Sequence, residues 1–208
     1  MEKAAIYDWV ESNNFEKNSL DSLRNRFRKG MPYPHIVIDN FLQVDKARLL
    51  LKELKKEEFK EKEADLFKFN QTDDLYFSKN KKIKEFHKAC CNWEFFNFIS
   101  HMTGVKFKGT LDMAGTLYES ADYLLCHDDE LEGRKIAYVL YLSEEFGPKD
   151  GGAFCLFDSV KGKPNKIVKK YGPRFNRLLL FEVSEKSFHE VEENLSKKTR
   201  YAISGWLH

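Results

Sequence analysis

A histidine and an aspartate two positions apart lie between two apolar runs near the middle of the chain. The stretch "YLLCHDDELEGRKIAYVLYL", residues 123–142, contains His127 and Asp129 at this point. An imidazole and a carboxylate at such a spacing can bind one metal ion. The same residues also suit an acidic turn between two strands, because Asp and Glu are readily solvated in loops. A metal site therefore requires further ligands from elsewhere in the sequence.

His189 is the histidine best placed to complete such a site. It lies in "SFHEVEE", at the start of a predicted strand that can pair near His127. Two histidines and one carboxylate make the facial ligand set of non-haem Fe(II) oxygenases, which leaves other coordination positions open. The other histidines are interpreted as surface, core or terminal residues: His35, His87, His101 and His208.

An arginine occupies an unusual position in the last predicted strand. With a period of two, residues 199–207 place Arg200 on the same face as Ala202, Ser204 and Trp206. A charged side chain beside small residues is uncommon in a packed core. This pattern suits a cavity in which a small anion contacts Arg200. The alternative is an edge-strand arginine in water.

The elements that position these residues change character along the chain. Apolar residues three and four apart predict a helix over 44–54 and a second helix over about 81–102, after a helical N-terminal extension at 1–30. The segment 59–80 is polar, with scattered aromatic residues and no clean period. Because so long a connection is seldom passive, we predict a lid loop at 59–80.

After Gly104 the pattern changes to strands separated by turn signals such as "FGPKDGG" and "KGKPN". Helices followed by strands predict one α+β domain over 1–208, in which the helices buttress one face of an antiparallel sandwich. The predicted strands lie near 111–119, 123–127, 134–143, 152–158, 166–170, 177–183, 187–191 and 199–207. The strand at 134–143 is apolar on both faces, so we expect it to be central.

Composition limits the class of protein. Hydrophobic residues make up 42% of the chain, enough for a sizeable core, and the charged residues nearly cancel to a net charge of +2. This balance gives no reason to expect direct nucleic-acid binding. No apolar run is long enough to span a bilayer, and the start "MEKAAIYDWVESNN" lacks a signal core. The cysteines have neither zinc nor disulfide spacing. We expect a cytoplasmic protein, also nuclear if the source is eukaryotic, with no membrane partner.

Four blocks of sequence resemble the 2-oxoglutarate- and Fe(II)-dependent oxygenases, and more closely the catalytic domain of the ribosomal prolyl hydroxylases, which are prolyl 4-hydroxylase-like. The blocks are "DLFKFNQTDDL", "LLCHDDELEGRKIAYVLYL", "LLLFEVSEKSFHEV" and "YAISGWLH", within roughly residues 31–208. The resemblance implies a double-stranded β-helix, or jelly roll. It also implies hydroxylation of a prolyl residue in a small-subunit ribosomal protein, with release of succinate and CO2. The implied cofactors are Fe²⁺, 2-oxoglutarate and O2, with ascorbate as a stimulant.

The resemblance further implies which residues hold the metal. His127, Asp129 and His189 would be the iron ligands, with no catalytic residue beyond this metal centre. Asp128 and Glu130 would support the ligands or form the turn around them.

The resemblance also implies the residues that hold 2-oxoglutarate. Arg200 would pair with its distal carboxylate, which a planar guanidinium can grip through two hydrogen bonds. Tyr141 would donate its hydroxyl to the same carboxylate. Tyr118 and Leu124 would line the pocket.

Other functions remain open on the sequence. The same chemistry could act on a different protein residue or on a free amino acid, and an inactive binding module or a metallohydrolase are further alternatives. A nucleic-acid base is disfavoured, since Trp206 stands where repair oxygenases usually carry a second arginine. Eukaryotic members of the family continue into a second, inactive domain. This chain ends directly after the last predicted strand, so we expect either a single-domain relative or a trimmed sequence.

Overall fold

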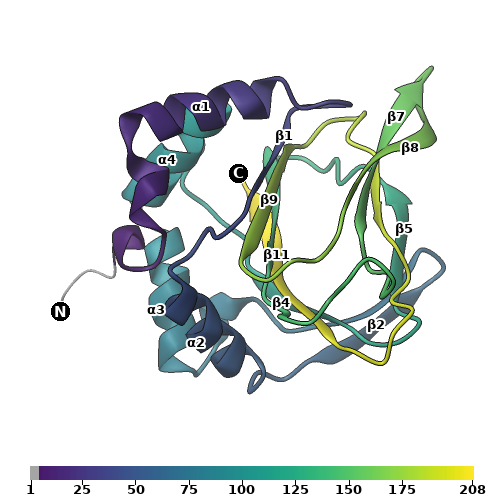
Figure 1. Ribbon diagram of the computed structural model, residues 1–208, viewed down its shortest axis with the longest axis horizontal. Coiled ribbons are helices and arrows are strands. Elements are labelled where there is room, and N and C mark those ends of the chain that lie inside the picture. The colour runs from purple at the N-terminus through teal and green to yellow at the C-terminus, as the bar shows by residue number, and fades with distance from the viewer. Residues whose placement is uncertain (1–4) are drawn as a thin grey trace.

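The computed structural model describes residues 5–208, in which one antiparallel sheet of 11 strands curls until its two halves face each other (Figure 1). The strands lie side by side in the order β1-β9-β6-β11-β4-β3-β5-β10-β7-β8, and β2 pairs with β3. The strand bounds are β1 His35–Ile38, β2 Lys60–Ala64, β3 Phe67–Gln71, β4 Ala114–Tyr118, β5 Tyr123–His127, β6 Ile136–Tyr141, β7 Phe154–Val160, β8 Lys163–Tyr171, β9 Arg177–Glu182, β10 His189–Val191 and β11 Arg200–Leu207.

The helices all lie against the outer face of one half of this sheet, on the left in Figure 1. They form a layer over β9, β6 and β11, whose outward side chains pack into the same hydrophobic cluster as those of the helices. The helix bounds are η1 Ile6–Asp8, η2 Ser12–Phe15, α1 Lys17–Arg28, α2 Val44–Leu54, η3 Leu75–Phe77, α3 Lys81–Cys90 and α4 Trp93–Thr103.

The central strand β6 separates two hydrophobic cores, as its two apolar faces predict. Ile136, Tyr138 and Leu140 pack into the cluster shared with the helices, whereas Ala137 and Tyr141 pack into the cluster inside the curled sheet. Since successive side chains of a strand point to opposite faces, one strand contributes to both cores. The interior core is where a site enclosed by the sheet must lie.

The predicted helix over 81–102 is wrong as a single element. The chain leaves the helical conformation at Cys91 and Asn92, so that α3 and α4 are separate helices. The buried residues include Ile83, Phe86 and Cys90 in α3 and Phe95, Phe98, Ile99 and Met102 in α4, and the break lets both sets pack into the same hydrophobic cluster. Trp93, in the middle of the predicted helix, is 64% exposed at the start of α4.

The segment 59–80, predicted as a lid loop, contains regular structure. The strands β2 and β3 form a hairpin, and η3 follows it. β3 pairs with β4 through Asn70 and Leu117 and with β5 through Phe67 and Leu124, so it joins the two halves of the curled sheet. The sequence did not indicate these strands because β2 is charged and exposed, with no apolar face to create a period, and β3 alternates only through Phe67 and Phe69. That the hairpin moves as a lid stays a prediction.

Every strand predicted after Gly104 overlaps an observed strand, from β4 to β11, and the helix predicted over 44–54 is α2. The predicted N-terminal extension contains η1, η2 and α1, while its first four residues lie outside the described part of the chain. β1, at the outer edge of the sheet, begins at His35, directly after Pro34. Among the described residues, no helix combines the length and the apolar character needed to span a membrane.

Candidate metal centre

The pairing of β5 with β10 brings two distant histidines opposite each other. His189 pairs with His127, and the next pair along the two strands is Val191 with Leu124. Two residues of β5 therefore lie between the pairs where β10 has one, so β5 contains one extra residue. Such a bulge shifts the side-chain alternation by one position. Without it, Leu124 and His127 would point to opposite faces of the strand. The bulge lets both point into the curled sheet, and the predicted pairing near His127 is confirmed.

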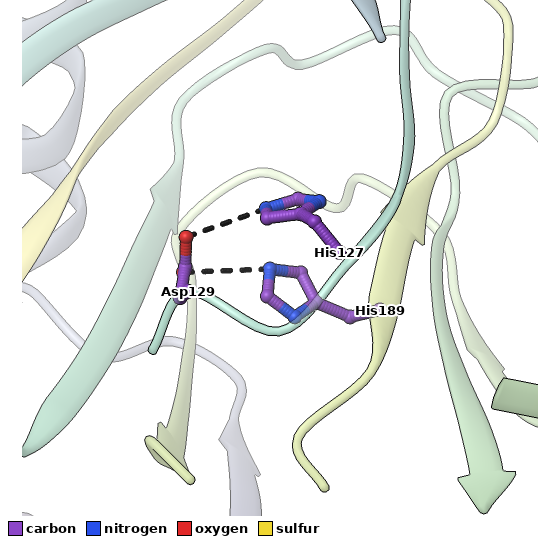
Figure 2. A group of neighbouring side chains, drawn as sticks. All are labelled: His127, Asp129 and His189. Carbon is purple, nitrogen blue, oxygen red and sulfur yellow. Dashed lines mark ion pairs between the residues drawn. The ribbon is translucent and has the colours of Figure 1, made fainter. Parts of the chain in front are cut away.

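Three side chains converge at this point and can hold one metal ion. One nitrogen or oxygen atom from each of His127, Asp129 and His189 lies within 4.8 Å of the others. Nε2 of His127 is 3.3 Å from Oδ1 of Asp129, and Nε2 of His189 is 3.4 Å from Oδ2 (Figure 2). The structure thus brings together the three residues that the sequence singled out as a ligand set.

Backbone hydrogen bonds orient both imidazoles. Nδ1 of His127 lies 2.8 Å from the carbonyl oxygen of Leu125, and Nδ1 of His189 lies 2.7 Å from that of Ser187. Because a carbonyl oxygen only accepts, each Nδ1 carries the proton and each Nε2 keeps its lone pair in the neutral ring. Both lone pairs therefore face the shared point near Asp129, as metal-binding histidines require.

The turn after β5 directs the carboxylate back toward the two rings. Asp129 has a φ of 65°, in the left-handed region that Asp tolerates better than most residues. The side chain of Asp128 accepts a hydrogen bond from the backbone N–H of Glu130. Asp128 is therefore a turn residue. Glu130 is exposed, with its backbone in the same turn.

Electrostatics match a site that binds a cation. Burial alone would raise the pKa of Asp129, but hydrogen bonds and charges of the two histidines hold that pKa well below its usual range. Burial also lowers the pKa of His189. The pKa of His127 is raised, since the neighbouring Asp129 carboxylate outweighs the effect of burial. A metal ion bound here would compete with a proton for Nε2 of His127.

An indole and a guanidinium hold the carboxylate from the other side. Nε1 of Trp206 donates to Oδ2 of Asp129 at 3.1 Å. The guanidinium of Arg134 stacks 3.5 Å from the centre of the Trp206 ring and donates to the backbone oxygen of Asp129. These contacts orient the carboxylate relative to the two imidazoles. Sequence reasoning missed this role, although the period of two had placed Trp206 on the inward face.

A small cavity joins the three candidate ligands to the buried Arg200. Its volume is about 100 Å³, and Tyr118, Leu124 and Trp206 are among its lining residues. Phe154 and Phe181 also line it and pack against the His189 ring. These apolar walls exclude water from one side of the centre. The positions of Tyr118 and Leu124 agree with the role that the resemblance implies for them.

Arg200 is a buried cation with no anionic partner within residues 5–208. It is 2% exposed, and its guanidinium lies over the rings of Tyr118 and Tyr141. Among the described residues, no carboxylate pairs with Arg200, and its Nε and the Tyr141 hydroxyl lack any hydrogen-bond partner. An unpaired buried charge is costly, so this position fits an anionic group of a small molecule. Tyr141, in contrast to Tyr118 and Leu124, does not line the cavity; its ring lies beside the Arg200 guanidinium.

We expect His127→Ala, Asp129→Ala and His189→Ala each to abolish high-affinity Fe²⁺ binding, because each removes one of three converging donors. Isothermal titration of Fe²⁺ under nitrogen measures this loss, and circular dichroism checks that the fold is kept. His101→Ala is the matched control, since His101 lies on α4 away from the centre. A variant that binds Fe²⁺ as the parent does would remove its residue from the ligand set.

We expect Trp206→Phe to weaken Fe²⁺ binding about tenfold, because phenylalanine keeps the ring beneath Arg134 but removes the donor to Asp129. The dissociation constant from the same titration measures the effect. Trp93→Phe, on the exposed start of α4, should leave it unchanged. Equal affinities for Trp206→Phe and the parent would show that the indole N–H does not orient the carboxylate.

Comparisons with known proteins agree with this geometry. Residues 113–208, which contain the three candidate ligands and Arg200, match the 2OG-Fe(II) oxygenase superfamily. A curated relative, prolyl 3-hydroxylase OGFOD1 of Mus musculus, is 44% identical over 180 residues. The match covers 85% of this chain and 33% of the relative, so the chain spans about a third of that protein's length.

Solved structures share the fold at low sequence identity. A prolyl-4-hydroxylase of Pseudomonas putida superposes with a TM-score of 0.71 at 18% identity, covering 89% of this chain and 98% of that one. The Trichoplax adhaerens prolyl hydroxylase, solved with a hypoxia inducible factor peptide, gives 0.71 at 19% identity and covers 94% of both chains. The predicted double-stranded β-helix is confirmed.

Fe²⁺, 2-oxoglutarate and O2 are the cofactors that the matched family implies. The chain carries a 2OG-Fe(II) oxygenase domain.

Proposed function

We propose that this chain uses Fe(II), 2-oxoglutarate and O2 to hydroxylate a prolyl residue in a protein. The observation that carries the proposal is one cavity that contains both a candidate metal site and an unpaired arginine. His127, Asp129 and His189 offer the donors for one metal ion, and Arg200 lines the same cavity with no carboxylate partner among the described residues. An inactive binding module would have no physical need for both features at once.

The chain's own residues supply binding and orientation. His127 and His189 would hold iron through Nε2, and Asp129 through one carboxylate oxygen while Trp206 keeps the other in place. Arg200 would bind the distal carboxylate of 2-oxoglutarate, which would satisfy its Nε–H.

The hydroxyl of Tyr141 would donate to the same carboxylate. When bound, iron with 2-oxoglutarate supplies the oxidative decarboxylation that yields succinate and CO2 and activates O2 for insertion into a C–H bond. Phe154 and Phe181 keep water away from His189 and so protect the centre from side reactions.

The substrate proposal rests on the relatives. The mouse relative is named a prolyl 3-hydroxylase, and the Trichoplax structure contains a peptide, so we propose carbon 3 of a prolyl ring within a polypeptide. The four sequence blocks that resemble the ribosomal prolyl hydroxylases support a small-subunit ribosomal protein as the candidate target. We place the activity in the cytoplasm, also in the nucleus if the source is eukaryotic.

The substrate proposal is tested by incubating the chain with Fe²⁺, 2-oxoglutarate and purified small ribosomal subunits from cells that lack the enzyme. We expect a mass increase of one oxygen on a single proline of one ribosomal protein, matched by formation of succinate. Amino-acid analysis then separates 3- from 4-hydroxyproline. Succinate formation with no modified ribosomal proline would keep the oxygenase chemistry and reject the ribosomal target.

We expect Arg200→Ala to raise the KM for 2-oxoglutarate at least about tenfold, because a charge-assisted pair with the cosubstrate is lost. The Fe²⁺ dissociation constant should stay within about twofold, since Arg200 is not one of the converging donors. Arg200→Lys keeps the buried charge and should give a smaller rise in KM. Equal losses of 2-oxoglutarate and Fe²⁺ affinity in both variants would indicate general damage to the cavity.

A further inference from the structure

The strands that carry the two candidate histidine ligands have a second surface. Along β5 and β10, Leu124, His127 and His189 face the cavity, whereas Leu125 and Glu190 line a groove on the opposite side of the sheet. This groove has a volume of about 1160 Å³, far larger than the cavity. It lies on the half of the sheet with β5, β7 and β8, which faces away from the helices in Figure 1.

The floor and rim of the groove are largely apolar. Leu125 is 44% exposed and Leu195 is 68% exposed, and Phe146, Pro148 and Pro173 also line it. Large exposed leucines gathered around one depression mark a binding surface more often than isolated apolar residues do.

The free charge of the groove is negative. Lys170 pairs with Glu192, and Arg174 and Arg177 share the one carboxylate of Asp39, so a single positive charge remains where these two arginines line the groove.

The acids that remain are Glu190 and Glu193. In the part of the chain that the structure describes, neither carboxylate forms an ion pair. Together with the one positive charge left by Arg174 and Arg177, these two acids give the groove a net charge of −1. An occupant that contacts Glu190 and Glu193 therefore carries positive charge together with apolar side chains.

Two residues of the groove are neighbours in the chain of the candidate metal ligands. Leu125 comes two residues before His127, and Glu190 directly follows His189. Both candidate ligands stand at strand ends, His127 as the last residue of β5 and His189 as the first of β10 (Figure 2). A polypeptide that leaves the groove at these strand ends therefore arrives at the rim of the cavity.

We propose that the groove lined by Leu125, Glu190, Glu193 and Leu195 docks a basic, leucine-containing segment of the protein substrate, next to the residue that is oxidised. This inference rests on the proposed function for its substrate, but not for the docking itself. The groove then adds affinity for a long polypeptide that the small cavity cannot provide, and it selects substrates by the charge around the target residue.

Fluorescence anisotropy with the full chain, loaded with Fe²⁺ under nitrogen, tests the docking step. The probe is a short fluorescein-labelled peptide of Lys, Arg and Leu with one central Pro, and its counterpart has Glu in place of each Lys and Arg. We expect binding of the basic probe only, weakened by added salt. The double variant Glu190→Gln/Glu193→Gln should lose about tenfold in affinity, the scale of two partly exposed ion pairs.

The matched control is Glu11→Gln/Glu16→Gln, which removes the same charge beside the N-terminal helices and should bind the probe as the parent does. Leu195→Ser should weaken binding without changing the charge. Unchanged affinity in the Glu190→Gln/Glu193→Gln variant, or equal binding of the acidic probe, would overturn the proposal.

A kinetic measurement separates this proposal from the proposed function. If the chain hydroxylates proline, Glu190→Gln/Glu193→Gln should raise the KM for a substrate with a flanking basic segment and leave the KM for a short substrate without it unchanged. Fe²⁺ affinity should also be unchanged. If no proline is hydroxylated by the parent chain, the proposed function fails while the anisotropy result still decides whether the groove binds basic peptides. A KM increase that is equal for both substrates would contradict docking in the groove.

Discussion

The cross-strand contact between β5 and β10 is the interaction on which the candidate site depends. His127 and His189 are far apart in the sequence, and only the pairing of these two strands brings their rings to a centroid distance of 4.1 Å. The extra residue in β5 is what turns His127 inward while Leu124 also faces the cavity. A shift of this register by one residue would carry a ligand to the solvent side of the sheet.

The hydrophobic layers keep this contact in place. Helices cover one half of the sheet, and the interior core of aromatic and aliphatic side chains fills the space between the halves. Within that apolar space, Asp129 is flanked by two imidazoles and an indole donor, while Arg200 lies between two tyrosine rings. The cavity thus has an anionic end at Asp129 and a cationic end at Arg200. Both lie in a surrounding of low dielectric constant, where electrostatic interactions with bound groups are strong.

The two faces of β5 and β10 carry different kinds of side chain. The alternation of a β-strand directs His189 and Val191 toward the cavity and Glu190 and Glu192 toward the groove. One sheet layer can therefore hold the reacting groups on its inside and contact a protein on its outside. With the proposed docking, recognition of a polypeptide is tied to the position of the candidate metal ligands, because both use the same backbone.

The sequence alone determined the fold class, the strands from β4 to β11, and the residues that converge at the candidate centre. The strands follow from local signals, a period of two and turn residues, whereas the double-stranded β-helix and the roles of the site residues were implied by the resemblance of four sequence blocks to a known family. It missed the break between α3 and α4 and the β2–β3 hairpin. Short polar strands carry no apolar period, so only pairing with neighbours reveals them.

Tertiary structure alone decided how the residues work together. The bulge in β5, the Trp206 donor to Asp129 and the exposed groove depend on which strand lies beside which, and on the register between them. A residue type at one position cannot specify a partner many residues away, because strand register is set by the packing of the whole sheet. The sequence identifies the residues that can bind a metal ion or an anion, and the tertiary structure sets the distances and directions between them.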